Sequence, residues 1–468
     1  DVTVTLWMKT SETSKEGMLF DTTKNVATNT GFFLDYRGDL AADTLDARFY
    51  NSGNLDRVLT GTAVSDGNWH FVAVTRDSSF VQVYLDGVRD GFAPSNSRDI
   101  TNANDLVIGS ASANAYFTGN IDEFQIYNRS LTSEQILALY SNRTDVIVSQ
   151  ETRGGDVWNV SVTPNDGSSD GVEEFSTGLT LVPLDVTNVT LNSSLALNLT
   201  GENLSLSYNL ANGSTSAVIN WFKGDESIMV LNMPFEGHSG DEHTIARDYS
   251  PFAYNGMVIN ATYSATGGYD GNGSYEFNGA DQSINITTAT GFDFDGQDFS
   301  VSAWVKPDYS SGDEERGIVC NSGAGTNNIQ WCLVTDGDQY NFYIDGNGAW
   351  GADDTALGGN VDSVWTHLVG VHDSGNSIKL YIDGVEVTSN EAIISNLFNP
   401  TNPELSIGYW PIGTQAYFDG NIDRLQVYNR SLTPEQITKL WENRTDIIVE
   451  NETAVDDVWN ASIIPVTA

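Results

Sequence analysis

The sequence contains a long internal repeat. Residues 117–132 read Phe-Thr-Gly-Asn-Ile-Asp-Glu-Phe-Gln-Ile-Tyr-Asn-Arg-Ser-Leu-Thr, and residues 418–433 read Phe-Asp-Gly-Asn-Ile-Asp-Arg-Leu-Gln-Val-Tyr-Asn-Arg-Ser-Leu-Thr. The match continues without a gap to Trp158-Asn159 and Trp459-Asn460, always 301 positions apart. Self-similarity over such a length predicts a tandem array of one large unit, and arrays usually present surfaces rather than carry out chemistry.

Acidic residues dominate the charged fraction of the chain. Its 63 acidic residues face 21 basic ones, giving a net charge of −42 over 468 residues. Such a polyanion is expected to repel nucleic acid and acidic membrane surfaces. The acidity is explained by a solvated surface, with divalent-cation binding or life in high salt as alternatives. Because no run of about 18 apolar residues occurs, we expect no membrane insertion in this segment.

The chain opens without a start Met or a signal peptide. Its first residues, Asp1 to Trp7, already alternate like a strand in the middle of a domain. We therefore expect a processed or truncated segment of something longer.

Acceptor sites for N-linked glycans, Asn-x-Ser/Thr, are dense and unevenly placed. None falls in 1–127 or 286–428, and three recur at the same place in both repeats. Glycosylation requires secretion and an exposed site, so this distribution predicts an extracellular glycoprotein. The fifteen predicted acceptors are Asn128, Asn142, Asn159, Asn188, Asn192, Asn198, Asn203, Asn212, Asn260, Asn272, Asn285, Asn429, Asn443, Asn451 and Asn460.

Short strands separated by Gly, Asn and Asp turns fill both repeats. Asp86-Gly87 and Asp383-Gly384 predict tight hairpins, since that pair favours positive φ in a two-residue turn. One short helix is predicted in each copy, over Leu131 to Tyr140 and Leu432 to Trp441. Many strands and little helix predict an all-β sandwich.

A set of ordered motifs in the second copy is typical of one family. They are Phe-Asn-Gly-Ala-Asp from Phe277, Phe-Ser-Val-Ser-Ala-Trp-Val-Lys-Pro from Phe299, Trp-Thr-His-Leu-Val from Trp365, Tyr-Ile-Asp-Gly from Tyr381 and Gly-Asn-Ile-Asp from Gly420. This order resembles laminin-G-like, concanavalin A-like jelly rolls. The resemblance implies two such sandwiches in an all-β chain.

The first copy matches only from Asp1, which aligns with Asp298, so about 70 residues of the second copy have no counterpart in it. Those residues are expected to hold the first strands of the sandwich. A fragment without them leaves exposed strand edges, unless another chain supplies the missing part.

The stretch 145–227 resembles pieces of an immunoglobulin-like sandwich in the wrong order. The run from Trp158 to Gly167 looks like late strands, whereas 204–221 looks like early strands and the core Trp. We therefore expect the second jelly roll to be inserted into an immunoglobulin-like unit; the alternative is one small sandwich at 145–227. The predicted domains are an N-terminally incomplete jelly roll at 1–144, late strands at 145–183, early strands at 184–227, the inserted jelly roll at 228–445 and truncated late strands at 446–468.

Cys320 and Cys332, the only cysteines, flank a turn-rich segment between two strand-like runs, and the first copy aligns Phe20 and Phe33 with them. The exchange of one apolar pair for another predicts facing side chains and hence a structural disulfide. Free buried thiols and metal or redox chemistry are the alternatives.

The resemblance implies a possible structural calcium ion as the only cofactor. In this family the carboxylate of Gly-Asn-Ile-Asp, here Asp122 and Asp423, often binds calcium together with an early loop, to which Asp248 would belong. Oxygen ligands of this kind suit calcium. The alternative is that Asp122 and Asp423 only accept backbone hydrogen bonds at the entrance of a strand.

Trp350, Tyr409 and Trp410 lie in Gly-, Asp- and Pro-rich segments and are candidates for stacking on sugars, with core packing as the alternative. We find no catalytic motif: neither His-Glu-x-x-His, Gly-x-Ser-x-Gly nor a strand with clustered carboxylates occurs.

The sequence thus predicts a non-enzymatic, secreted cell-surface glycoprotein that serves adhesion or assembles an extracellular filament or layer. Such mixed arrays resemble prokaryotic, especially archaeal, surface proteins. The expected partners are further copies, added strand to strand, with extracellular glycans as a second class of partner. A carbohydrate-binding module array and, less favoured, a polysaccharide-cleaving enzyme are the alternatives.

Overall fold

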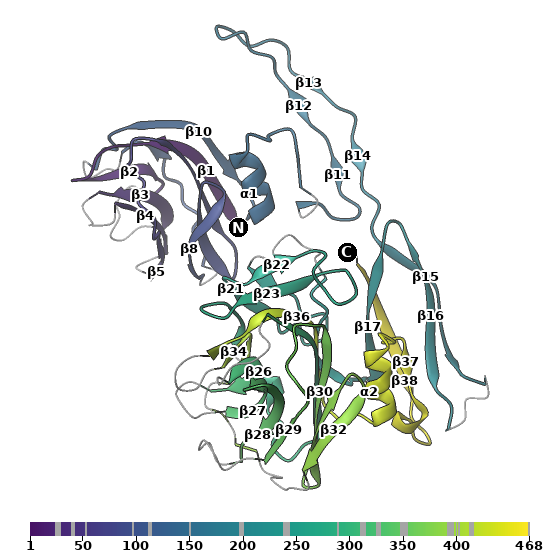
Figure 1. Cartoon of the computed structure of the whole chain (residues 1–468). Coiled ribbons are helices and arrows are strands. Elements are labelled where there is room, and N and C mark those ends of the chain that lie inside the picture. Colours follow the sequence, from purple (N-terminus) through teal and green to yellow (C-terminus); the bar gives the residue numbers. More distant parts are fainter. Residues whose placement is uncertain are drawn as a thin grey trace. The chain divides into compact units, whose positions relative to one another are not determined.

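The chain divides into unit 1, Asp1–Thr152, and unit 2, Arg153–Ala468 (Figure 1). The computed structural model describes residues 1–23, 30–38, 43–51, 54–95, 98–110, 115–148, 151–195, 201–236, 244–287, 290–308, 315–323, 329–346, 354–390, 397–398, 400, 403–410 and 416–466.

Unit 1 is a sandwich of two five-stranded antiparallel sheets, in the orders β10-β1-β6-β7-β8 and β5-β4-β3-β2-β9. Alternate residues of both sheets point inward, among them Val4, Leu34 and Val83, and form one core. The elements are β1 (Val2–Lys9), β2 (Glu16–Asp21), β3 (Gly31–Arg37), β4 (Thr44–Asn51), β5 (Asn54–Leu59), β6 (Trp69–Arg76), β7 (Phe80–Leu85), β8 (Val88–Pro94), β9 (Val107–Ile108), β10 (Asn120–Tyr127) and α1 (Ser133–Tyr140).

Unit 2 contains a larger sandwich of the same kind. One sheet has the order β22-β23-β36-β25-β30-β31-β32, with β19 also paired to β36, and the other β20-β21-β24-β33-β26-β27-β28-β29. The elements are β19 (Met229–Met233), β20 (Ile245–Ala246), β21 (Gly256–Ile259), β22 (Thr262–Ser264), β23 (Ser274–Asn278), β24 (Ser283–Thr287), η2 (Thr290–Phe292), β25 (Phe299–Pro307), β26 (Arg316–Ser322), β27 (Ile329–Asp336), β28 (Gln339–Ile344), β29 (Asp354–Gly358), β30 (Thr366–Asp373), β31 (Ser377–Ile382), β32 (Val385–Asn390), β33 (Glu404–Ile407), β34 (Tyr409–Trp410), β35 (Ala416–Tyr417), β36 (Asp419–Tyr428) and α2 (Pro434–Trp441).

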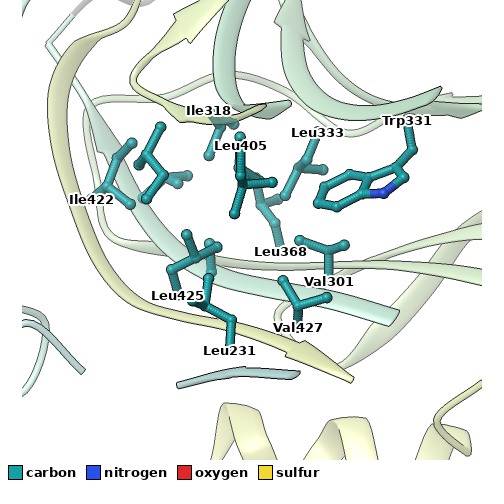
Figure 2. Packing of buried hydrophobic residues seen from close by; sticks show 14 of the residues in the cluster. Leu231, Val301, Ile318, Trp331, Leu333, Leu368, Leu405, Ile422, Leu425 and Val427 are labelled. Carbon is teal, nitrogen blue, oxygen red and sulfur yellow. The ribbon is translucent and has the colours of Figure 1, made fainter. Parts of the chain in front are cut away.

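The core of this larger sandwich includes side chains from strands that have no counterpart among the described residues of unit 1. Figure 2 shows Leu231 of β19 beside Leu425 and Val427 of β36, with Leu333 and Leu405 of the second sheet above them. All five side chains are 0% exposed, so β19 is an integral part of the core.

Two three-stranded sheets each combine strands that precede this sandwich in the sequence with a strand that follows it. They have the orders β15-β16-β37 and β18-β17-β38, and β17 pairs with β38 over eight residues, Ser216 with Val466 through Lys223 with Trp459. The chain therefore leaves one small sandwich after β18, forms the jelly roll and returns to the same small sandwich. The elements are β15 (Asp185–Ser193), β16 (Leu204–Ala211), β17 (Ser216–Lys223), β18 (Glu226–Ser227), β37 (Ile447–Ile448), η3 (Glu450–Glu452) and β38 (Trp459–Val466).

A shared apolar cluster fixes the small sandwich to the jelly roll within unit 2. Trp221 and Ile448 pack with Val369 and Tyr381 of the jelly roll and with Ile437 of α2. The indole N–H of Trp221 also donates to the carbonyl of Thr445 at 2.8 Å. The junction is thus a packed interface.

The first repeat continues differently after its helix. Strand β11 (Val157–Trp158) pairs with β14 (Leu179–Thr180), and β12 (Ser161–Val162) pairs with β13 (Glu174–Phe175). The two pairs follow one another along a two-stranded ribbon, which Figure 1 shows. Most side chains of this ribbon are exposed. Within the described part of the chain, β12 has no partner equivalent to the β17 that pairs with β38. The domain boundaries given above stay predictions.

The two predicted helices and hairpins are present. Helix α1 begins after Thr132 and α2 after Thr433, and each threonine hydroxyl accepts a backbone N–H of the first turn. Asp86 and Asp383 have φ of 51° and 49°, as their tight turns require. None of the described helices has the length and apolar character needed to cross a membrane.

Candidate functional site

The repeated Gly-Asn-Ile-Asp segment belongs to β10 in unit 1 and to β36 in unit 2, and a β-bulge directly follows its aspartate. In unit 2 this position is covered. Asp423 is 1% exposed and accepts the backbone N–H of Tyr269 at 2.9 Å. Its neighbour Arg424 has φ of 49°, forms an ion pair with Asp270 and lies 3.7 Å from Glu236. Glu236 follows β19 and Asp270 precedes β23, so both acidic residues come from the segment that covers the edge of β36.

Burial raises the pKa of two carboxyl groups at this position, those of Asp423 and Glu236. It raises the pKa of Asp423 to about 8, and burial together with the charge of Asp270 raises the pKa of Glu236 to about 7. Asp423 Oδ1 and Glu236 Oε2 are buried, and neither has a hydrogen-bond partner among the described residues. The positive charge of Arg424 stabilises the carboxylates that surround it.

Asp248, the third predicted calcium ligand, is not linked to Asp423 by any hydrogen bond or ion pair of the described residues. Its carboxylate accepts the backbone N–H groups of Asn232, Ser250 and Tyr254 and the hydroxyl of Ser250. In the described ranges no group of three or more His, Cys, Asp or Glu is arranged to hold a metal ion. With Arg424 beside Asp423, and with three backbone N–H groups donating to Asp248, the Asp423–Asp248 pair does not fit a calcium site. Asp423 accepts a backbone N–H, as its alternative states.

The equivalent position in unit 1 is exposed to solvent. Asp122 and Glu123 are exposed, and Asp122 accepts the backbone N–H of Glu123 at 2.9 Å. Glu123 has φ of 48°, so the bulge is the same, but a carboxylate stands where unit 2 has Arg424. Calcium at Asp122 stays a prediction.

Of the predicted sugar-stacking residues, Trp410 lies in the core. It is 3% exposed and packs in a cluster with Cys320, Cys332 and Tyr343, so a sugar cannot reach its ring; the expected exposure is wrong. Tyr409 is half-buried and stacks on Tyr417. Trp350 lies outside the described residues.

The predicted disulfide between Cys320 and Cys332 is present, joining residues directly opposite each other on β26 and β27. The alignment with unit 1 needs a correction by one residue. Phe33 lies opposite Asp21, not Phe20, so Asp21 is the counterpart of Cys320. Phe20 instead points into the core of unit 1.

A buried ionic cluster on the outer face of unit 1 was missed by the sequence reading. Asp46 on β4 is fully buried and accepts hydrogen bonds from Arg48 and Arg57, while its cross-strand neighbour Asp35 lies 3.8 Å from Arg48. The Arg48 guanidinium also lies over the ring of Phe33. The signal was available in the charged residues at alternate positions of paired strands, since such residues share one face of a sheet.

Two carboxylates of a glycosidase must face a groove about 5–10 Å apart. Asp35 and Asp46 do not meet this requirement, because both are buried and Asp46 is held by arginines.

The predicted glycan acceptors lie at the surface wherever they are described. None of the fourteen described acceptor side chains is buried. Asn203, Asn272 and Asn285 are half-buried, the other eleven are exposed, and Asn198 lies outside the described residues. Occupancy of these sites stays a prediction.

The sequence matches one protein family twice. The family model described as "Concanavalin A-like lectin/glucanases superfamily" covers residues 1–137 and 277–438. These ranges contain the strands of unit 1 and, in unit 2, those from β24 to β36; each range ends within a helix, and together they make up more than half of the chain. The chain therefore belongs to the concanavalin A-like lectin/glucanase superfamily, as the motifs predicted.

Solved structures with a similar fold include the binding domain of botulinum neurotoxin serotype G, with 14% identity and a TM-score of 0.38 over 46% of this chain and 51% of that one. Another is domain 4 of the GH43 extracellular arabinanase AbnA from Geobacillus stearothermophilus, in complex with arabinotriose, with 22% identity and a TM-score of 0.32 over 45% of this chain and 97% of that one. The chain spans about half the length of the neurotoxin binding domain. No curated protein matches the sequence.

Proposed function

We propose that this chain is a non-enzymatic, extracellular cell-surface glycoprotein that serves adhesion or the assembly of a filament or surface layer. In this proposal a neighbouring subunit completes unit 1 by adding strands to its uncovered sheet edges. The observation that carries the proposal is that, among the described residues, β10 and β9 of unit 1 each have an unpaired side, whereas the equivalent strands of unit 2, β36 and β33, are paired on both sides.

The first edge is that of β10. Among the described residues β10 pairs only with β1, whereas its counterpart β36 pairs with β25 on one side and with β19 and β23 on the other. Ile126 of β10 is consequently 47% exposed, while the equivalent Val427 is 0% exposed. An uncovered strand that carries inward-facing apolar residues is a template for another strand.

The second edge is that of β9. In the described part of unit 1, β9 pairs only with β2, whereas its counterpart β33 lies between β24 and β26. Ile108 is 48% exposed and the equivalent Ile407 is 0% exposed. We call the free sides of β10 and β9 the open edges of unit 1. Strand addition at both would supply the backbone hydrogen bonds and apolar cover that unit 2 already has.

The disulfide and the acceptor sites support an extracellular location. Disulfides persist in oxidising compartments, and the described acceptors are accessible to a glycosylating enzyme. Glycopeptide mass spectrometry of protein purified from its source tests this part. Unmodified asparagine at Asn128, Asn142, Asn429 and Asn443 together would contradict it.

Light scattering after size-exclusion chromatography, over a range of protein concentrations, tests assembly. The proposal expects concentration-dependent oligomers, and an edge substitution such as Ile126→Lys should shift them toward monomer. Val88→Lys, on the exposed far edge strand β8 of the same sheet, is the matched control. A monodisperse monomer at every concentration would contradict self-association.

Glycan binding is the second candidate, favoured by the superfamily and by the partly exposed Arg57 on the outer face of unit 1. A planar guanidinium group suits the hydroxyls of a sugar. A glycan array probed with and without calcium tests this candidate. Binding that Arg57→Ala abolishes would support it, and silence under both conditions would count against it.

A further inference from the structure

His70 of unit 1 lies between two carboxylates that belong to different segments. Its Nδ1 lies 2.8 Å from Asp86 Oδ2, in the turn between β7 and β8, and its Nε2 lies 3.1 Å from Asp66 Oδ1, in the loop between β5 and β6. An ionised carboxylate only accepts hydrogen bonds, so both contacts are hydrogen bonds only when both ring nitrogens carry a proton. The geometry therefore fits the imidazolium form of His70.

The turn that carries Asp86 is held in place by contacts of its own. The backbone N–H of Asp86 donates to the carbonyl of Phe71 at 2.8 Å, and Asp86 Oδ1 accepts the Phe71 N–H at 2.9 Å. A side chain at Gly87 would collide with Leu137 and Tyr140, so the turn packs closely against α1. The turn is thus a fixed point to which the loop can be attached.

The loop that carries Asp66 is attached to this turn through His70. From Asp66 to Asn68, the backbone N–H of Gly67 donates to the carbonyl of Thr10 at 2.9 Å, while Asn68 donates its backbone and side-chain N–H groups to Asp66 itself. The Asp66 side chain is 51% exposed. Loss of the hydrogen bond to His70 would therefore leave this part of the loop in water rather than in the core.

The two aspartates favour the charged form of His70. Burial alone would lower the pKa of His70, but hydrogen bonds to Asp86 and Asp66 outweigh it, so this pKa lies above the ordinary value of 6.5. Hydrogen bonds from Asn68 and His70 lower the pKa of Asp66 to about 2. Asp66 is consequently ionised throughout the range in which His70 titrates.

The other elements packed around His70 add one charged group nearby. On β1, Met8 lies opposite His70, and Lys9 is the next residue along the strand. Helix α1 places Leu137 and Tyr140 against the turn. The charged groups that His70 contacts are therefore the two aspartates.

Unit 2 forms the same turn without the histidine. Thr366 occupies the position of His70, and Asp383 Oδ1 accepts the backbone N–H of His367 at 3.0 Å. The turn therefore does not need an imidazole in order to fold. Unit 2 consequently provides an internal reference that lacks the titrating group.

We propose that His70 is a pH-dependent clasp of unit 1, in which the imidazolium binds the Asp66 loop to the Asp86 turn and loss of one proton releases residues 66–68. The neutral ring has a single N–H, so it donates to only one of the two carboxylates. Because the pKa of His70 is raised in the folded chain, the clasp is complete below 6.5 and is lost as pH rises through the raised value. The clasp does not depend on the proposed assembly.

Two measurements on the intact chain test the clasp. Nuclear magnetic resonance of the chain with ¹³C-labelled histidine rings gives the pKa of His70, whose signal is assigned by its loss in the variant His70→Thr. Hydrogen–deuterium exchange of peptides covering 66–71, divided by the intrinsic exchange rate at each pH, reports how firmly the loop and turn are closed. Peptides covering 362–367 are the reference from unit 2.

The pKa of His70 should lie above 6.5. Protection of residues 66–71 should fall at least about threefold between about pH 5.5 and about pH 8.5, because one pKa unit is a factor of ten in the equilibrium, and the reference peptides should not change. Asp66→Asn should lower the pKa of His70 and remove most of the pH dependence. Asp105→Asn, which removes the same charge from an exposed position of unit 1, should do neither.

A pKa of His70 at or below 6.5 would overturn the proposal. An equal pH-dependent loss of protection in the variant His70→Thr would also overturn it, because the loss would then come from other groups. This variant carries the residue that unit 2 has at the same position, so its fold should be retained. At about pH 8.5 its protection at 66–71 should match that of the wild-type chain, in which the clasp is open.

Discussion

Asp35 and Asp46 are cross-strand neighbours whose surroundings act on them in opposite directions. Burial and the charge of Asp46 raise the pKa of Asp35 to about 7. Burial alone would raise the pKa of Asp46 too, but hydrogen bonds from Arg57 and Arg48 outweigh it and lower that pKa. Asp35 therefore favours folding while protonated, and its contribution is lost as pH rises from about 4 to about 7.

Substitution of the two residues should have opposite effects. At pH 8, Asp35→Asn should raise the free energy of unfolding of unit 1 by about 1 kcal/mol or more, and near pH 4 the gain should vanish. Asp46→Asn should lower it by about 2 kcal/mol, because it leaves Arg48 and the partly exposed Arg57 without the buried carboxylate that accepts their hydrogen bonds. Denaturant unfolding monitored by exchange of unit 1 peptides measures both. A pH-independent Asp35→Asn effect would contradict the assignment.

The disulfide predicts a difference between the units. Cys320 and Cys332 are 12 residues apart, so the bridge should stabilise the sandwich of unit 2 by about 3 kcal/mol on the chain-entropy model. Reductant should lower the unfolding temperature of unit 2 and leave unit 1, which has no cysteine, unchanged. The double variant Cys320→Ala and Cys332→Ala should be insensitive to reductant. An equal shift in both units would argue against this assignment.

At the scale of elements, the repeat provides matched positions in covered and uncovered strands. Val427→Asp should cost unit 2 at least about 3 kcal/mol, since it places a charge in the core. Ile126→Asp, at the equivalent position of β10, should cost unit 1 about 1 kcal/mol or less because that side chain reaches water. Equal costs would mean that β10 is covered in solution.

Local signals predicted these elements well. Thr132 and Thr433 mark the starts of both helices, and Asp-Gly pairs mark two hairpins. The burial of a loop residue and the register of two strands depend on distant parts of the chain, so local sequence signals did not predict them. Trp410 follows a glycine-containing turn that suggests exposure, yet it packs on the outer face of a sheet beside the disulfide. The counterpart of Cys320 is Asp21 rather than Phe20, which the pairing of β2 with β3 reveals. An alignment that is wrong by one residue assigns a side chain to the opposite face of a strand.

At the scale of the whole molecule, the gap-free part of the repeat runs through the jelly roll's last strand, the helix and the strand that follows it. In unit 2 this stretch joins two packed sandwiches, with Trp221, Ile448 and Ile437 in one cluster. In unit 1 the equivalent of Ile448, Ile147, is 45% exposed. Sequence similarity predicted the duplicated fold, but only the strand pairing revealed which edges lack cover.

Hydrogen–deuterium exchange of residues 120–127, compared between the isolated chain and assemblies isolated from the source cells, tests the central claim most directly. If another subunit completes unit 1, these amides should exchange rapidly in the isolated chain and at least about tenfold more slowly in the assembly, approaching residues 421–428. Equal, rapid exchange in both samples would contradict strand addition at this edge.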